Sequence, residues 1–228
     1  VLRRARQGLR LDRRAALLLA GATLWPGRAG AAWREVRFPG RAANRFTVDG
    51  GMVRVTSDGA VSVLWRDVAV DLAATPILAW RWRVDAAPPP TALARRGGDD
   101  RALALYATFD ADPTTETLGT RLRRAMLEPF VEGAMPGRVL TFVWGGDGAT
   151  MGWFVNPYLA ESGRMRVLRG PEAPLGVWLD EAVDLRAEHD AAFGEPARTL
   201  LQLGVSADTD DTASRAEATL ELLGFRSA

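Results

Sequence analysis

The sequence contains no cysteine, no lysine and a single histidine, and these absences exclude several kinds of site. Without cysteine there is no disulfide framework and no thiol nucleophile, and a chain of 228 residues can bury a core without cross-links. A zinc site with two or more His or Cys ligands is excluded by count. The single histidine, His189, lies in a polar segment, and the sequence has no Gly-x-Ser-x-Gly motif for a nucleophilic serine. We therefore expect His189 to be a surface residue without a catalytic role.

The basic charge of the chain is unevenly distributed. All 29 basic residues are arginines, against 28 acids, and seven of the arginines lie in residues 1–32 with Asp12 as the accompanying acid. From Trp33 onward the chain is therefore mildly acidic. A mildly acidic protein gains little from contact with a polyanion, so nucleic acid is not an expected partner. The oligomeric state is left open by the sequence.

Residues 1–32 have the features of an export signal. The pair Arg13-Arg14 is followed by a short apolar run, by Pro26-Gly27, and by the small residues Ala29, Gly30 and Ala31. The run is too short to cross a hydrocarbon core of about 30 Å, so no transmembrane anchor is expected. The arginine pair is typical of a twin-arginine signal, and an ordinary secretory signal is the alternative. We expect cleavage near Ala31 or Ala32 and a periplasmic or secreted protein.

The remaining residues, 33–228, alternate apolar and polar side chains with a period of two, which indicates β-strands. Many strands without intervening helices favour antiparallel pairing. The pattern predicts one all-β domain, a two-sheet antiparallel sandwich of the jelly-roll or galactose-binding-like kind with one or two short helices inserted. The expected strands cover residues 53–56, 61–66, 78–84, 102–109, 139–144, 165–169, 199–206 and 218–225.

Three segments have more specific expectations. In the strand at 77–84, Leu78, Trp80 and Trp82 share one face, so we expect this face to be buried and the strand to be central. Residues 114–128 and 183–193 are the expected short helices. Residues 86–100 contain three consecutive prolines, which cannot donate to a β-ladder, and are expected to form a long loop.

The densest polar cluster directly follows an apolar strand. Asp208, Asp210 and Asp211 lie within four residues, and their carboxylates repel one another unless a cation, an arginine or backbone amides compensate. Ca²⁺ binds six to eight oxygens and suits such a turn, so these three residues are the candidate metal ligands. The alternatives are an Asx-turn, or pairing with the nearby Arg215. Apart from a possible Ca²⁺, no cofactor is expected.

A second set of residues is the candidate ligand-binding rim. Asp99 and Asp100 end the proline-rich loop, and Trp144 and Trp153 flank a glycine-rich segment, where we expect them to be partly exposed. Aromatic rings stack on sugar rings and carboxylates bind hydroxyls, so this combination favours a glycan or another small polar ligand.

Several motifs, taken in order, resemble the bacterial family known as domain of unknown function 3047. They are Leu78–Val84, Asp99-Asp100 leading into Leu105–Phe109, Val143-Trp144, Gly176–Trp178, Phe193–Pro196, Asp208–Thr212 and Leu222–Phe225. The resemblance implies an exported β-sandwich without an established activity. This chain departs from the family pattern in two places: Arg101 stands where an aromatic residue is usual, and an arginine usual before the tyrosine-containing strand is missing near Ala104.

Three functions remain open at this point. The leading hypothesis is a non-catalytic protein that binds a glycan or a small polar ligand in the cell envelope. The second is a hydrolase or lyase of envelope polysaccharide, which needs paired carboxylates from Asp99, Asp100, Asp208 and Asp210. The third is a structural envelope protein, which predicts a flat apolar patch instead of a polar site.

Overall fold

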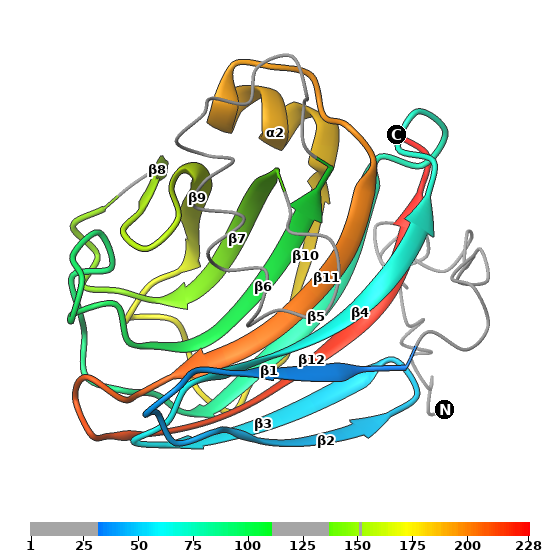
Figure 1. The fold of residues 1–228 in the computed structure, drawn as a ribbon. Helices are drawn as coiled ribbons and strands as arrows, with labels where there is room; N and C mark the ends of the chain where they lie inside the picture. Colours follow the sequence, from blue (N-terminus) through cyan, green and yellow to red (C-terminus); the bar gives the residue numbers. More distant parts are fainter. Residues whose placement is uncertain (1–31, 111–136, 151) are drawn as a thin grey trace, which may run out of the picture.

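The computed structural model describes residues 32–110, 137–150 and 152–228, which form two β-sheets packed face to face (Figure 1). One sheet has seven strands and the other has five. All neighbouring strands are antiparallel except β7 and β9, which are parallel. The predicted all-β, two-sheet sandwich is confirmed.

The order of strands within each sheet differs from their order in the sequence, so each sheet joins distant parts of the chain. The seven-stranded sheet has the order β1 (Arg34–Arg37), β4 (Ser62–Val70), β11 (Leu200–Asp208), β6 (Arg101–Phe109), β7 (Arg138–Gly145), β9 (Ala160–Arg169) and β8 (Trp153–Asn156). The five-stranded sheet has the order β10 (Leu179–Asp184), β5 (Ile77–Ala86), β12 (Arg215–Arg226), β3 (Met52–Asp58) and β2 (Arg45–Asp49).

The main core lies between the two sheets. On β5, the alternating residues Leu78, Trp80, Trp82 and Val84 are fully buried, and β5 is interior to its sheet, between β10 and β12. The expected burial of this face is confirmed. Trp80 and Trp82 meet edge to face with ring centroids 5.6 Å apart, an arrangement that suits the charge distribution of aromatic rings.

A second, smaller core covers the outer face of the seven-stranded sheet. Leu93, from the proline-rich loop before β6, packs there with Tyr106 and Met165. Because β6 contacts a core on each face, all nine of its residues are buried. The long loop therefore acts as a cover for one face of this sheet.

The helix α2 (Leu185–Phe193) is close to the expected segment 183–193, although residues 183 and 184 still belong to β10. Asp184 caps its first turn by accepting hydrogen bonds from the amides of Arg186 and Ala187. The other expected helix, 114–128, lies outside the described residues. Within the part of the chain that is described, no helix has the length and apolar character needed to cross a membrane.

Candidate functional site

Two acidic segments that are far apart in the sequence meet at one end of the seven-stranded sheet. Asp99 and Asp100 directly precede β6, and Asp208 is the last residue of β11. The two strands are antiparallel neighbours whose register pairs Arg101 with Asp208. The turn after β11 therefore lies beside Asp99 and Asp100, and we call these residues with Arg101 and Asp208–Asp211 the acidic cluster.

Arg101 lies at the centre of the acidic cluster, with 8% of its side chain exposed. Its Nη1 donates to the backbone oxygen of Asp99 at 2.6 Å and to the Asp99 carboxylate at 3.0 Å, and lies 3.2 Å from Asp208 Oδ2. Its Nη2 donates to the Tyr106 hydroxyl at 2.8 Å. Burial lowers the pKa of Arg101, but the charges of Tyr106, Asp208 and Asp99 outweigh this effect and hold the pKa above its ordinary value. Arg101 is therefore cationic and fixes both carboxyl groups.

Asp208 is the carboxyl group that resists ionisation. Burial raises the pKa of Asp208 to about 8; Arg101 acts against this rise, and the charges of Asp99 and Asp210 add to it. Among the described residues its buried Oδ1 has no hydrogen-bond donor. When Asp208 is protonated, its carboxyl group can donate a hydrogen bond to the neighbouring Asp210, so it no longer lacks a partner. Asp210 is itself paired with Arg41 at 2.7 Å.

Asp100 stabilises the turn after β11. Its Oδ1 accepts from the Asp211 amide at 3.2 Å, and its Oδ2 accepts from the amide (2.8 Å) and the hydroxyl of Thr212. One carboxylate oxygen from each of Asp100, Asp210 and Asp211 lies within 4.8 Å of the others. The three carboxylates that could share a cation therefore include Asp100, whereas Asp208 faces Arg101.

The proposed compensation of this turn by Arg215 is wrong. Arg215 pairs with Glu217 on its own strand, β12. The arginines that neutralise the turn come from elsewhere in the sequence, namely Arg41 and Arg101.

The two tryptophans of the expected rim pack in or against the main core, and neither contacts the acidic cluster. Trp144 belongs to the main core, where its ring centroid is 5.7 Å from that of Trp82. It is 2% exposed, so the expected partial exposure of Trp144 is wrong. Trp153 is half-buried, packs on Phe142 at 5.5 Å and donates from Nε1 to Glu188 of α2 at 3.0 Å. Neither ring joins Asp99 and Asp100 in one surface.

His189 is buried, with 1% exposed, so its expected place at the surface is wrong. Its ring packs against Phe109 and Phe193, and its Nδ1 shares a hydrogen bond of 2.9 Å with the backbone oxygen of Glu195. Burial lowers the pKa of His189, which favours the neutral ring. The polar residues around His189 in the sequence did not indicate that its face of α2, which includes Leu185, is buried.

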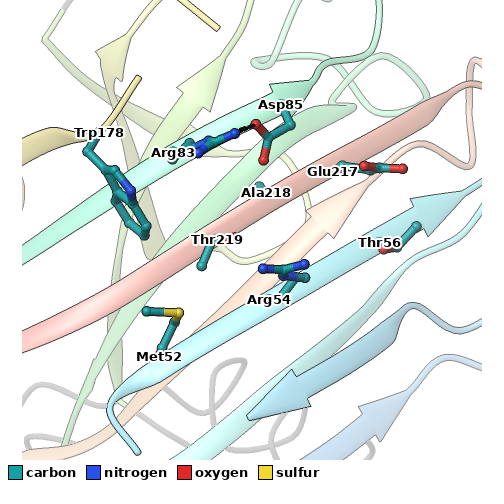
Figure 2. A pocket seen from close by; sticks show the side chains of 9 residues that line it. All are labelled: Met52, Arg54, Thr56, Arg83, Asp85, Trp178, Glu217, Ala218 and Thr219. Carbon is teal, nitrogen blue, oxygen red and sulfur yellow. Dashed lines mark hydrogen bonds and ion pairs between the residues drawn. The ribbon is translucent and has the colours of Figure 1, made fainter. Parts of the chain in front are cut away.

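A hollow that the sequence did not single out lies on the outer face of the five-stranded sheet (Figure 2). Its volume is about 180 Å³. Charged groups, hydroxyls and one aromatic ring line it, and the lining residues are Met52, Arg54, Thr56, Arg83, Asp85, Trp178, Glu217, Ala218 and Thr219. None of them belongs to the acidic cluster.

Four residues of this hollow, together with Thr47 beside it, form a row across the five-stranded sheet. The register pairs Thr47 with Arg54, Arg54 with Thr219, and Thr219 with Arg83. Trp178 directly precedes β10, whose Leu179 pairs with Trp82, so Trp178 follows Arg83 at the end of the row. We call these five residues the transverse row: Thr47, Arg54, Thr219, Arg83 and Trp178. Thr219, only 5% exposed, forms its floor.

The alternating pattern did place these side chains opposite the core-facing ones. What it could not show is that residues from four separate strands and from the segment before β10 align, because their alignment depends on strand order and register. A polar strand face also looks the same in sequence whether it contacts water or a ligand.

Comparison with solved structures found similar folds at low sequence identity. The xyloglucanase domain of NopAA, a type three effector from Sinorhizobium fredii solved in complex with cellobiose, has a TM-score of 0.41 and 12% identity, covering 88% of this chain and 95% of its own. A loop-swap mutant of Xyn11A from Necallimastix patriciarum has a TM-score of 0.34 and 8% identity, covering 86% of this chain and 99% of its own. A search of curated proteins found no match.

The resemblance inferred from the motifs is confirmed by a sequence profile that matches residues 31–223, which is most of the chain. The acidic cluster and both sheets, apart from the last three residues of β12, lie within this range. The chain belongs to the family described as "Protein of unknown function (DUF3047)".

Proposed function

We propose that this protein binds a glycan across the outer face of its five-stranded sheet, along the transverse row. The observation that carries the proposal is the alignment of two hydroxyls, two guanidinium groups and an indole ring in one row, in which every residue except Thr47 lines the hollow. Hydroxyls and guanidinium groups bind sugar hydroxyls, while an aromatic ring packs on the apolar face of a sugar ring.

The dimensions of the row suit a short chain of sugars. Five strands at a spacing of about 4.8 Å give the row a length of about 19 Å. The hollow, at about 180 Å³, is smaller than the ~300–1,000 Å³ typical of pockets that enclose a drug-sized ligand. An open face with a shallow hollow can accommodate one unit of a polymer while its neighbours extend along the row.

Trp178 is positioned to act as the stacking platform. It is half-buried and lines the hollow, and the guanidinium carbon of Arg81 lies 4.9 Å from its ring centroid. This cation–π contact holds the ring in one orientation, so little side-chain entropy is lost when a ligand binds. Arg81 is itself fixed by an ion pair with Glu221.

A second candidate function is polysaccharide hydrolysis at the acidic cluster. The raised pKa of Asp208 favours it, because a carboxyl group that keeps its proton beside an ionised one can act as a general acid. The burial of Asp99 and Asp208 against Arg101 opposes it, because both groups are engaged. Release of reducing sugars by the wild type, lost in Asp208→Asn, would establish hydrolysis.

We also propose that the protein acts outside the cytoplasm, in the periplasm or after secretion. The support is the segment 1–32, with its Arg13-Arg14 pair, short apolar run and small residues before Trp33. Glycans of the cell envelope would then be accessible to it.

The glycan proposal is tested with the full chain and two tryptophan variants. The probes are soluble β-glucan, xylan, polygalacturonate and alginate, with affinity electrophoresis as the measurement. Trp33 provides a matched control, because it is also half-buried and also has an arginine, Arg66, 5.4 Å from its ring centroid. We expect Trp178→Ala to weaken binding at least tenfold and Trp33→Ala to leave it unchanged. Absence of binding to every probe, or equal binding by the wild type and Trp178→Ala, would contradict the proposal.

A further inference from the structure

Arg54 has no counter-ion in the described part of the chain, although the other charged groups that line the hollow are paired. It is exposed near the middle of the transverse row, and within the described residues its side chain makes no hydrogen bond or ion pair. Of the other charged residues that line the hollow, Arg83 pairs with Asp85, and Glu217 pairs with Arg215. The hollow therefore presents one uncompensated positive charge.

The residues that pair with Arg54 on the two adjacent strands both carry hydroxyl groups. Thr47 lies beside it on β2 and Thr219 lies beside it on β12. A guanidinium group offers two parallel N–H donors that match the two oxygens of a carboxylate, and flanking hydroxyls can donate to the same oxygens. The guanidinium group of Arg54, which has no acceptor within the described residues, and the two hydroxyls beside it therefore suit an anionic group of the ligand.

We infer that the glycan bound along the transverse row carries carboxylate groups, as uronic acids do, and that Arg54 binds one of them. This inference rests on the proposed glycan function and specifies its ligand. The mildly acidic charge of residues 33–228 does not oppose it, because charges on other faces are screened over a Debye length of about 8 Å at physiological salt.

Arg45 supplies a matched control for Arg54. It is on the neighbouring edge strand β2 and is exposed, and its side chain, like that of Arg54, makes no hydrogen bond or ion pair within the described residues. Its register partner is Thr56, in the adjacent row, and it does not line the hollow. Arg45→Gln and Arg54→Gln therefore change the net charge equally but differ in their distance from the proposed carboxylate site.

The experiment compares acidic glycans with neutral forms of the same polymers. Polygalacturonate, alginate and glucuronate-bearing xylan are each tested beside their carboxyl-reduced forms, using the full chain at two salt concentrations. We expect the wild type to bind at least one acidic form about tenfold more tightly than its reduced form, with the preference shrinking at high salt. Arg54→Gln should lower binding of the acidic form to the level of the reduced form, and Arg45→Gln should change it less than twofold.

The possible results separate this inference from the proposed function. If the wild type binds acidic and reduced forms equally and Trp178→Ala abolishes both, the carboxylate inference is wrong and the glycan function stands. If Arg45→Gln weakens binding as much as Arg54→Gln, the attraction is diffuse and Arg54 is not the site. If no probe binds in either form, both proposals are wrong.

Discussion

At the scale of single residues, Arg101 supplies the positive charge of the acidic cluster, a role that the sequence analysis did not assign to it. The resemblance to the family suggested an aromatic residue at position 101 and an arginine near Ala104, and this chain has neither. In the structure the Arg101 guanidinium contacts both Asp99 and Asp208. A guanidinium group therefore reaches the acidic cluster from a neighbouring position on the same strand.

The first prediction concerns the stability that depends on Arg101. Arg101→Gln leaves two buried carboxyl groups without their cation, and removal of one partner from a buried ion pair costs about 3–5 kcal/mol. We expect a decrease of this size in the free energy of unfolding, measured by urea denaturation. Arg34→Gln, which removes an exposed pair with Asp67, should cost less than about 1 kcal/mol. Equal losses in the two variants would show that the burial of Arg101 has no energetic consequence.

The second prediction concerns pH. Because the pKa of Asp208 is raised in the folded protein, to about 8 from a model-compound value of 3.8, the folded state binds a proton that the unfolded state releases. This contribution to stability is complete below about pH 4 and is lost as the pH rises through about 8. Asp208→Asn carries no titrating group, so its stability relative to the wild type should increase between pH 5 and pH 9. Urea denaturation across this range measures it, and a constant difference would refute the raised pKa.

Single residues also show where sequence reasoning was limited. It identified Asp99, Asp100 and Asp208 as polar residues at strand ends, because such positions follow from local patterns. It did not identify the partner arginine, and it misplaced Trp144 and His189, because burial depends on what the rest of the chain packs against a residue. Both are now known to be buried.

At the scale of elements, alternation predicted the long strands well and the short edge strands poorly. The strands β3, β4, β5, β6, β7, β9, β11 and β12 all coincide with expected segments. The strands β1, β2, β8 and β10 were not expected, and each of them lies at the edge of its sheet. Edge strands have one hydrogen-bonded neighbour and fewer buried side chains, so their periodicity is weaker.

A third prediction separates the two tryptophans of β5, which are both fully buried. Trp82 Nε1 donates to Glu181 at 3.0 Å, whereas Trp80 Nε1 is buried with no partner among the described residues. Substitution by Phe removes a similar volume at each position, but only Trp82→Phe removes a hydrogen bond. We expect Trp82→Phe to be more destabilising than Trp80→Phe by about 1–2 kcal/mol in urea denaturation, because the bond is to a charged group. Losses that are equal, or larger for Trp80→Phe, would contradict this assignment.

At the scale of the whole molecule, the two outer faces of the sandwich differ in a way that the sequence pattern did not reveal. The proline-rich loop covers part of the seven-stranded sheet, where Leu93 packs beside Tyr106. The five-stranded sheet presents the transverse row, which includes the exposed Arg54. Period-two alternation describes each strand alone, and which face a loop covers is decided by long-range packing. The fold class could therefore be predicted, but the most open polar face could not.

The last prediction concerns calcium and the acidic cluster as a source of overall stability. Asp100 accepts three hydrogen bonds from residues 211 and 212, Asp210 pairs with Arg41, and Asp208 faces Arg101. Ca²⁺ requires six to eight oxygen ligands, and most of the carboxylates here already have donors or cations. We therefore expect the melting temperature of the full chain to be the same in millimolar Ca²⁺ and in chelator.

Arg41→Gln provides the control for this measurement, because it frees Asp210 without changing the turn. A metal that binds the native state raises stability with the logarithm of its concentration, so a site created or strengthened in Arg41→Gln should give a Ca²⁺-dependent rise in melting temperature. A rise in the wild type itself would show that calcium, and not arginine, completes the charge balance of Asp100, Asp210 and Asp211. In that case the cluster would be a metal site whose occupation stabilises the end of both β6 and β11.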